Sequence, residues 1–285
     1  MERSEAAEGG TRSLFDGAMR LLRQQAILSA VAGLFEERDI DVFVVSFPKC
    51  GRTWLRVQLG RVFQQYFHLD VENLVEVQEI AERHPAIPRL RFTHPGRPQE
   101  KRADELSAAW VDYFRFRKVI FLMRDPRDVV VSLYHERTKR GMEPVFSGSL
   151  SEFIHEPVGS FDTLIAFYNI WAARRGAEKR TLVVRYEDMH ASPESTLRAV
   201  LEFIRLGRIG TREIFDAIAF TQFERMKEME RNNVLKSWRL SPGNPDDPNS
   251  FKTRRGRVGG YQDELSEEEI ASLNRRMATS LRVPY

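Results

Sequence analysis

Short runs of apolar residues alternate along the chain with segments in which apolar residues recur at helical spacing. Four runs have the length and the side chains of buried β-strands: the run that starts at Val42, and Leu90–Thr93, Lys118–Met123 and Thr181–Arg185. Strands that alternate with helices usually join into a parallel sheet through right-handed crossovers. The pattern therefore predicts an α/β fold of three layers, with a central parallel sheet flanked by helices.

The helical segments and loops between these strands can also be placed. Between residues 151 and 176 the spacing predicts two helices, interrupted around Pro157-Val158-Gly159. Ser192-Pro193 has the residue types of a helix N-cap and first turn. Residues 237–250 are rich in proline, asparagine and aspartate and predict a long loop.

The N-terminal region has a separate pattern. Apolar residues from Leu14 to Ala26 recur at helical spacing and predict a helix that packs on the protein or, alternatively, lies on a membrane surface. The run from Ala26 to Phe35 is too short to span a bilayer, so we expect no transmembrane segment. We expect disorder over residues 1–11 and a single domain over residues 12–285.

Composition narrows the class of protein only modestly. The chain has 285 residues, of which 42% are hydrophobic and 30% charged, enough to bury one large core. Its net charge of +3 suits an anionic ligand, but basic and acidic residues are interspersed, which argues against nucleic-acid binding. A single cysteine excludes an intrachain disulfide and a multi-cysteine zinc site, and the histidines show no metal-ligand spacing. We expect a cytoplasmic protein that requires no metal.

Polar residues suited to chemistry follow each predicted strand. Lys49, His94, Arg124 and Tyr186 come after the first, second, third and fourth strands. The carboxyl ends of parallel strands meet at one edge of a sheet, and open α/β sheets bind ligands there. The sequence therefore predicts one binding site that contains all four residues.

The turn after the first strand has the pattern of an anion site. Backbone N–H groups that converge at the start of a helix, together with the helix dipole, bind phosphate. Gly51 and Thr53 fit the phosphate loop of nucleoside-triphosphate enzymes, whereas Ser46 replaces its first glycine and Arg52 its lysine. The turn predicts a P-loop-like fold. A P-loop kinase or GTPase remains the alternative function, although the loop lacks the lysine and the magnesium ligands that this class needs.

The third strand leads into a second candidate anion site. Arg124 ends the strand, Asp125 and Pro126 suit the cap and first position of a helix, and Ser132 lies on the same helix face as Asp125. An arginine and a hydroxyl can hold a phosphate together. The alternative is that Arg124 forms a structural ion pair and that Ser132 is surface.

Five motifs, in order, resemble those of sulfotransferases that use 3′-phosphoadenosine 5′-phosphosulfate (PAPS). Pro-Lys-x-Gly-x-Thr-Trp at 48–54 resembles their 5′-phosphosulfate loop, and Arg-x-Pro-x-Asp-x-x-x-Ser at 124–132 resembles their 3′-phosphate motif. The other three are similar to their adenine-contacting and closing segments: Tyr186-Glu187-Asp188, Thr221-Gln222-Phe223-Glu224-Arg225-Met226-Lys227 and Arg254-Arg255-Gly256.

This resemblance implies roles for individual residues. His94 is the general base that takes the acceptor's proton, and Lys49 stabilises the leaving phosphate of adenosine 3′,5′-bisphosphate (PAP). The implied nucleotide-binding residues are Lys49, Cys50, Gly51, Arg52, Thr53, Trp54, Arg124, Ser132, Tyr186, Thr221, Phe223, Met226, Arg254, Arg255 and Gly256. A non-catalytic protein with a retained nucleotide pocket is a further alternative, but it would be signalled by loss of Lys49 or His94, and both are present.

Departures from the family pattern leave some roles open. Members of the family usually carry a lysine two positions before the histidine, where this chain has Phe92, so Arg91 and Arg52 are the candidates to supply that cation. Cys50 is either a packing residue or a reactive thiol. Trp54 is either core or a wall beside the adenine. The acceptor, whether small molecule, sugar or lipid, would contact the loops at 80–89, 138–157 and 232–250, and neither its identity nor the oligomeric state can be derived from the sequence.

Overall fold

The computed structural model describes residues 39–140, 145–173 and 178–283. The following description concerns the compact unit Asp41–Tyr285. The predicted helix from Leu14 to Ala26 and the expected disorder over residues 1–11 lie outside the described residues. None of the helices in the described ranges is long and apolar enough to cross a membrane.

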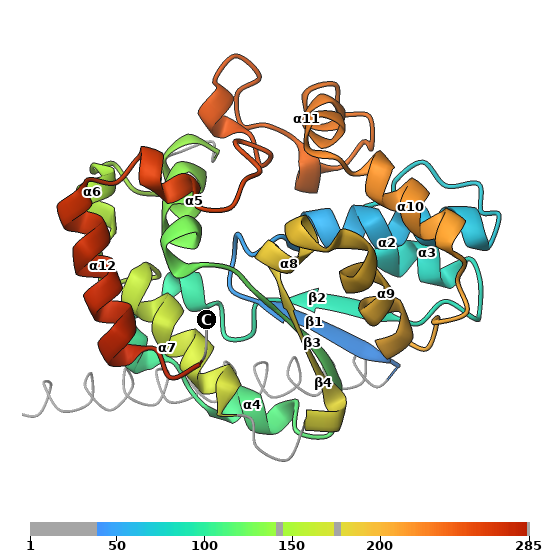
Figure 1. The fold of residues 1–285 in the computed structure, drawn as a ribbon, viewed down its shortest axis with the longest axis horizontal. Helices are drawn as coiled ribbons and strands as arrows, with labels where there is room; N and C mark the ends of the chain where they lie inside the picture. The colour runs from blue at the N-terminus through green and yellow to red at the C-terminus, as the bar shows by residue number, and fades with distance from the viewer. Residues whose placement is uncertain (1–38, 141–144, 174–177, 284–285) are drawn as a thin grey trace, which may run out of the picture. The chain divides into compact units, whose positions relative to one another are not determined.

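Four parallel strands form the central sheet (Figure 1). They are β1 (Val42–Ser46), β2 (Leu90–Thr93), β3 (Lys118–Met123) and β4 (Thr181–Arg185), in the order β2-β1-β3-β4. Val44 of β1 is aligned with Phe92 of β2 and with Ile120 of β3. The predicted strands and the α/β fold class are confirmed.

The order of the strands determines where a ligand can bind. The chain passes from β1 to β2 on one side, and then returns across β1 to place β3 on its other side. The reversal of direction leaves a crevice outside the carboxyl ends of β1 and β3, which is the usual ligand site of such sheets. Lys49 and Arg124 follow these two strands and therefore lie beside that crevice.

Helices connect and flank the strands. In chain order they are α2 (Arg52–Tyr66), α3 (Val77–Glu82), α4 (Ala109–Tyr113), α5 (Pro126–Lys139), α6 (Leu150–Phe153), α7 (Phe161–Ala172), α8 (Tyr186–Ala191), α9 (Pro193–Phe203), α10 (Thr211–Phe220), α11 (Phe223–Arg231) and α12 (Glu267–Ser280). The predicted break around Pro157-Val158-Gly159 separates α6 from α7. Short 3₁₀ turns at Trp238–Leu240 and Pro248–Ser250 interrupt the predicted long loop.

Helix starts follow the capping residues in the sequence, with one difference. Asp125 caps α5, because its carboxylate accepts a hydrogen bond of 2.9 Å from the amide of Arg127. Pro193 is the first residue of α9, as expected, but the side chain of Ser192 makes no capping hydrogen bond. The fixed backbone angle of proline favours a helix start even without a capping side chain.

The sheet is covered on both faces, which explains why its inner strands are apolar throughout. Figure 1 shows α2, α9 and α10 on one side of the sheet and α4 and α7 on the other. On the second side, the ring of Phe121 in β3 stacks on Trp171 of α7 with centroids 5.7 Å apart. Phe43 of β1 meets Phe114 edge-on at 4.9 Å. Aromatic contacts of this kind contribute about 0.5–1.5 kcal/mol beyond the area that they bury.

Candidate active site

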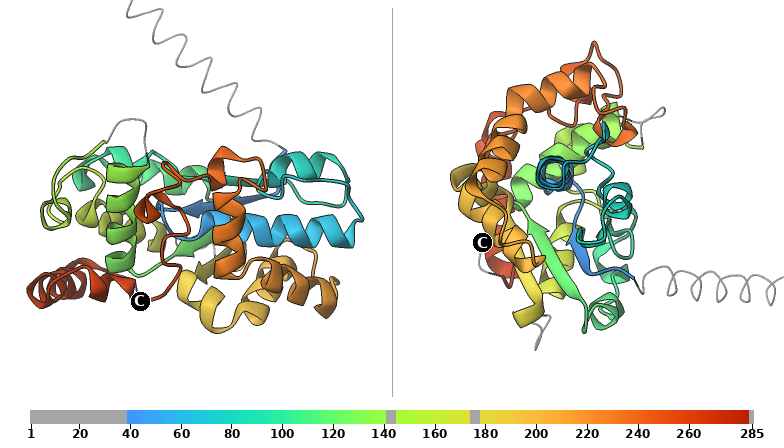
Figure 2. Two further views of the ribbon diagram at one scale, coloured as in Figure 1. Left: turned by 90° about the horizontal axis from the view of Figure 1, so that it is seen from above. Right: turned by 90° about the vertical axis from the view of Figure 1, so that its right-hand side faces the viewer.

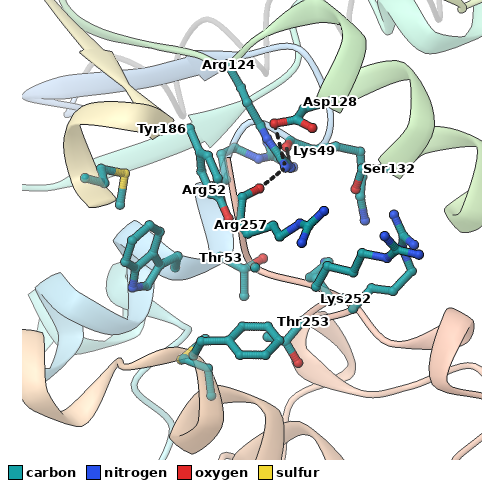
Figure 3. A pocket seen from close by; sticks show the side chains of 18 of the residues that line it. Lys49, Arg52, Thr53, Arg124, Asp128, Ser132, Tyr186, Lys252, Thr253 and Arg257 are labelled. Carbon is teal, nitrogen blue, oxygen red and sulfur yellow. Dashed lines mark hydrogen bonds and ion pairs between the residues drawn. The ribbon is translucent and has the colours of Figure 1, made fainter. Parts of the chain in front are cut away.

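A pocket of about 440 Å³ lies at the carboxyl ends of the strands. Lys49, His94, Arg124 and Tyr186, the four residues that the sequence placed at strand ends, all line it. Figure 3 shows side chains from several elements that converge on this space, among them Arg124 after β3, Ser132 of α5 and Lys252 of the C-terminal region. The volume is in the usual range for a ligand site.

The turn between β1 and α2 holds its backbone in an unusual conformation. Lys49 and Gly51 have φ angles of 71° and 92°, both in the left-handed region. Gly51 is the N-cap of α2 and has no side chain to cap the first amides of the helix. A Cβ at this position would also lie 2.8 Å from the ring of Tyr186. The first amides of α2 are thus available to an anion, and only glycine fits the turn.

The side chain of Lys49 is buried in the pocket wall beside a counter-ion, Glu136. Its ammonium lies 3.6 Å from a carboxylate oxygen of Glu136, and its side chain is 7% exposed. Burial lowers the pKa of Lys49, while the charge of Glu136 opposes that shift. Burial by itself would raise the pKa of Glu136, but Lys49, Lys252 and Arg140 lower it to about 2. The Glu136 carboxylate is therefore ionised at neutral pH.

The guanidinium of Arg124 is held by several contacts. Its guanidinium donates to the carbonyls of Lys49, at 3.4 Å, and Arg257, at 3.2 Å, and lies 3.5 Å from a carboxylate oxygen of Asp128. It also stands 4.2 Å above the ring of Tyr186. Its Nε is buried and has no hydrogen-bond partner among the residues that the structure describes. The ion pair foreseen as an alternative is present, and one buried donor is still left for a ligand.

A residue of α7 connects this arginine to the phosphate loop. The hydroxyl of Tyr168 accepts a hydrogen bond from the amide of Arg124, at 3.0 Å, and donates one to the carbonyl of the same residue, at 2.8 Å. The thiol of Cys50 lies 3.4 Å from the same hydroxyl. Burial raises the pKa of Cys50 to about 12, which supports a packing role for this residue.

The segment from Phe251 to Tyr261, here called the strap, runs beside α5 (Figure 2), and its residues 252–257 and Gly260 line the pocket. Asp128 of α5 fixes it, because its carboxylate accepts hydrogen bonds from the amides of Gly259, at 2.9 Å, and Tyr261, at 3.0 Å. Glu264 lies 2.7 Å from the guanidinium of Arg254 and 2.5 Å from His135. The strap thereby adds Arg254, Arg255 and Arg257 to the pocket that Arg124 lines.

The other end of the pocket is aromatic. The indole of Trp54 donates a hydrogen bond of 3.0 Å to the carbonyl of Thr221, and its ring lies 5.6 Å from that of Tyr186 and 4.7 Å from that of His190. Phe223 also lines this end, and a Cβ added to Gly256 would lie 1.9 Å from its ring. Trp54 is a wall of the pocket. The arrangement can hold a flat heterocycle, with anions bound beside it.

His94 is oriented by the end of β1. Its Nδ1 lies 2.6 Å from the backbone carbonyl of Ser46. A carbonyl oxygen only accepts hydrogen bonds, so Nδ1 carries the proton and Nε2 keeps a free lone pair in the neutral ring. Burial, and then the charge of Arg52, lowers the pKa of His94 to about 3. The ring is therefore neutral at physiological pH.

The structure brings together all the predicted site residues except Cys50, which packs behind the loop instead of lining the pocket. Their roles stay predictions. Of the two candidates for an extra cation, Arg52 lines the pocket, whereas Arg91 does not belong to its wall. Phe92 lies under the guanidinium of Arg56, 4.4 Å from its ring centre.

The pocket also contains charged residues that were not singled out from the sequence, among them Glu136 and Lys252. Glu136 lies four residues after Ser132, hence on the same face of α5, a helical spacing that could have identified it. Lys252 precedes the arginines of the strap, and nothing in its local sequence distinguishes it from a surface lysine. Its burial results from the path of the strap.

Comparisons with known proteins agree with this geometry. A family model described as the sulfotransferase domain matches residues 39–282. Cytosolic sulfotransferase 12 of Arabidopsis thaliana is 25% identical, with 90% of this chain and 82% of the relative covered. The amine sulfotransferase of Oryctolagus cuniculus is 24% identical, with 85% of this chain and 80% of the relative covered.

Solved structures show a similar fold. Mouse sulfotransferase SULT7A1 complexed with PAP aligns with a TM-score of 0.61 at 19% identity, over 87% of this chain and 86% of that one. Retinol dehydratase in complex with androsterone and the inactive cofactor PAP aligns with a TM-score of 0.58 at 17% identity, over 86% and 82%. At this level of identity the likeness concerns the fold.

Proposed function

The chain belongs to the sulfotransferase domain family and is a PAPS-dependent sulfotransferase, and we propose that it transfers the sulfuryl group to a hydroxyl or amine of a small acceptor. We further propose that His94 is the general base and that Lys49 stabilises the leaving phosphate. Flavonol 3-sulfotransferase of Flaveria bidentis and the rabbit amine sulfotransferase are named for small acceptors of these two kinds. The names of the plant relatives support a cytosolic location. The match to the family disfavours the kinase or GTPase alternative.

One observation carries the proposal: the pocket has two separate cationic regions beside one aromatic region. Trp54, Tyr186 and Phe223 fit an adenine. Arg124 and the arginines of the strap fit one phosphate, and the β1–α2 turn with Lys49 fits the other. Adenosine 3′,5′-bisphosphate has one base and two phosphates. The buried, unpaired Nε of Arg124 also fits a ligand that supplies an acceptor there.

The residues can divide the chemistry between them. Bound PAPS would supply an activated sulfuryl group whose leaving oxygen becomes negatively charged, as in phosphoryl transfer. The ammonium of Lys49, which has three protons and lies 3.6 Å from Glu136, would stabilise that oxygen. The free Nε2 of His94 would take the proton of the acceptor. Glu136 would then stabilise the charged imidazole, because its negative charge raises the pKa of His94.

The test is transfer of the labelled sulfuryl group from PAPS to an acceptor library, together with thermal unfolding. PAP without magnesium should stabilise the wild type, whereas ATP with magnesium should not, because a ligand stabilises the folded state only when its concentration is comparable to or above its Kd. Lys49→Ala should reduce turnover by at least about a hundredfold, the usual scale for one transition-state donor.

Lys139→Ala is the matched control, since Lys139 is an exposed lysine of α5. It should have wild-type turnover. If Lys49→Ala also turns over at the wild-type rate, Lys49 has no part in the chemistry. If PAP fails to stabilise the wild type, the nucleotide assignment of the pocket is wrong.

A further inference from the structure

Lys252 is a lysine of the pocket wall to which the proposed chemistry gives no role. Its ammonium donates a hydrogen bond of 2.9 Å to the backbone carbonyl of Arg239. A carbonyl satisfies one of three ammonium protons. Figure 3 shows the side chain in the same pocket as Lys49 and Arg52, although it comes from the strap and they come from the β1–α2 turn.

A buried carboxylate holds the backbone of Lys252 in place. Glu230 of α11 is fully buried. Its two oxygens accept hydrogen bonds from the amide of Lys252, at 2.6 Å, and from the amide and hydroxyl of Thr253, at 2.8 and 2.7 Å. Charge-assisted hydrogen bonds to a buried carboxylate are strong and costly to break. The strap is therefore fixed at a residue that lines the pocket.

The surroundings of Lys252 contain more positive than negative charge. Burial, opposed by Glu136 and reinforced by Arg140, Lys49 and Arg52, lowers the pKa of Lys252 to about 7. Glu136 is already the counter-ion of Lys49, and Glu230 is engaged by the strap backbone. Several buried cations that share one carboxylate are unfavourable unless an anion joins them.

The anion that would bind beside Lys252 differs from the 3′-phosphate. Arg124 and Arg254 lie in the region proposed for that phosphate, with Asp128 and Glu264 as their counter-ions. The charge of Lys252 acts instead on His94, whose pKa it lowers, and on Glu136. Lys252 thus interacts with the proposed general base and with Glu136. The sulfuryl group would lie in this part of the pocket during its transfer from donor to acceptor.

We propose, on the basis of the proposed function, that Lys252 is a catalytic residue whose ammonium contacts the sulfuryl oxygens during transfer. In that step the bond between sulfur and the bridging phosphate oxygen breaks, and its electron pair stays on the phosphate beside Lys49. A bond forms from the acceptor oxygen or nitrogen to sulfur, and the acceptor's proton passes to Nε2 of His94. Lys252 thereby supplies from the strap the second cation for which β2 has only Phe92, and Glu230 is its positioning residue.

The experiment compares Lys252→Met with Lys236→Met, a lysine whose side chain is 72% exposed. PAP carries no sulfuryl group, so its affinity for Lys252→Met should equal that of the wild type. Single-turnover transfer from PAPS should fall by about a hundredfold, the scale of one lost transition-state donor, and Lys236→Met should change neither quantity. Wild-type transfer by Lys252→Met, or an equal loss of PAP affinity and transfer, would overturn the proposal.

A second variant restores the charge without restoring the lysine. In Lys252→Cys, alkylation with 2-bromoethylamine attaches an aminoethyl group to the thiol with loss of bromide and a proton, which recreates an ammonium at nearly the same distance from the backbone. The treatment should recover most of the lost transfer, and failure to recover it in fully alkylated protein would contradict the role. The wild type treated in the same way is the control, because Cys50 is buried. A wild type that binds PAPS but transfers nothing would instead refute the proposed function.

Discussion

The carbonyl of Ser46 decides which nitrogen of His94 is available for chemistry. Because that carbonyl lies 2.6 Å from Nδ1 and can only accept a hydrogen bond, the neutral ring has its lone pair on Nε2. A backbone group at the end of β1 therefore orients the proposed base, a task that other enzymes assign to a carboxylate. A substitution of the Ser46 side chain would leave this carbonyl in place.

His94→Ala should leave the affinity for PAP unchanged and lower transfer by about 10²–10⁴, the normal contribution of a positioned base. A base works above its pKa, so activity is lost as the pH falls through that value. Burial, with Arg52, lowers the pKa of His94 to about 3 from 6.5, and the acid limb of kcat/KM for PAPS should therefore lie well below pH 6.5. The pH–rate profile measures this limb. A limb that persists unchanged in the variant would assign the base elsewhere.

Arg124→Ala should weaken PAP binding by about 2–3 kcal/mol, the range for a charge-assisted bidentate contact, and barely affect adenosine 5′-phosphate, which lacks the 3′-phosphate. Titration calorimetry with both nucleotides gives the comparison. Arg198→Ala serves as control, because Arg198 pairs with Glu194 on the surface of α9 with 40% of its side chain exposed. Equal losses for the two nucleotides would make Arg124 a structural residue, as its ion pair with Asp128 allows.

Individual site residues could be predicted where a strand or a helix start fixes them. Lys49, Arg124 and His94 follow apolar runs whose ends are visible in the sequence, and a parallel sheet brings those ends together. Lys252 could not be recognised, because its partners Glu136 and Arg239 come from other parts of the chain. The side of a loop on which a charge is buried depends on tertiary contacts that no local pattern contains.

At the scale of elements, α7 contacts both β3 and the phosphate loop. It packs Trp171 on the sheet and places the hydroxyl of Tyr168 against both backbone groups of Arg124. That hydroxyl also lies against Cys50. Tyr168 therefore adds a link between the two anion sites to the direct pairing of β1 with β3.

Tyr168→Phe should lower the free energy of unfolding by about 1–3 kcal/mol, because it leaves the amide of Arg124 buried without a partner. It should also weaken PAP binding. Denaturant unfolding measures the first effect and calorimetry the second. Tyr66→Phe, at a side chain that is 38% exposed near the end of α2, should change neither. Unchanged stability of Tyr168→Phe would mean that another group replaces the hydroxyl.

Elements differed in how well the sequence predicted them. The inner strands β1 and β3 were predicted correctly because they are short apolar runs buried on both faces, with polar residues at their ends. The strap was expected to close over the phosphate but carries no apolar period, and it is fixed instead by amides that bind Asp128 and Glu230. Interactions of backbone groups with distant carboxylates leave no trace in a residue pattern.

At the scale of the whole molecule, the alternation of strands and helices predicted a parallel sheet but not the order of its strands. Several orders are compatible with right-handed crossovers. The observed order, β2-β1-β3-β4, is the one that opens a crevice between β1 and β3 and so determines that Lys49 and Arg124 face the same ligand. The position of residues 1–38 lies outside the described structure.

The spread of the pocket along the chain also has a consequence for protein synthesis. Its wall begins at Pro48 and includes Gly260. At the usual rates of translation, about 5–20 residues per second, the phosphate loop leaves the ribosome roughly 10–40 s before the strap that faces it. During this interval the pocket is incomplete, so nucleotide binding cannot stabilise β1 and its apolar neighbours in the nascent protein. Donor or product in the cell can stabilise the fold only after Gly260 has been made.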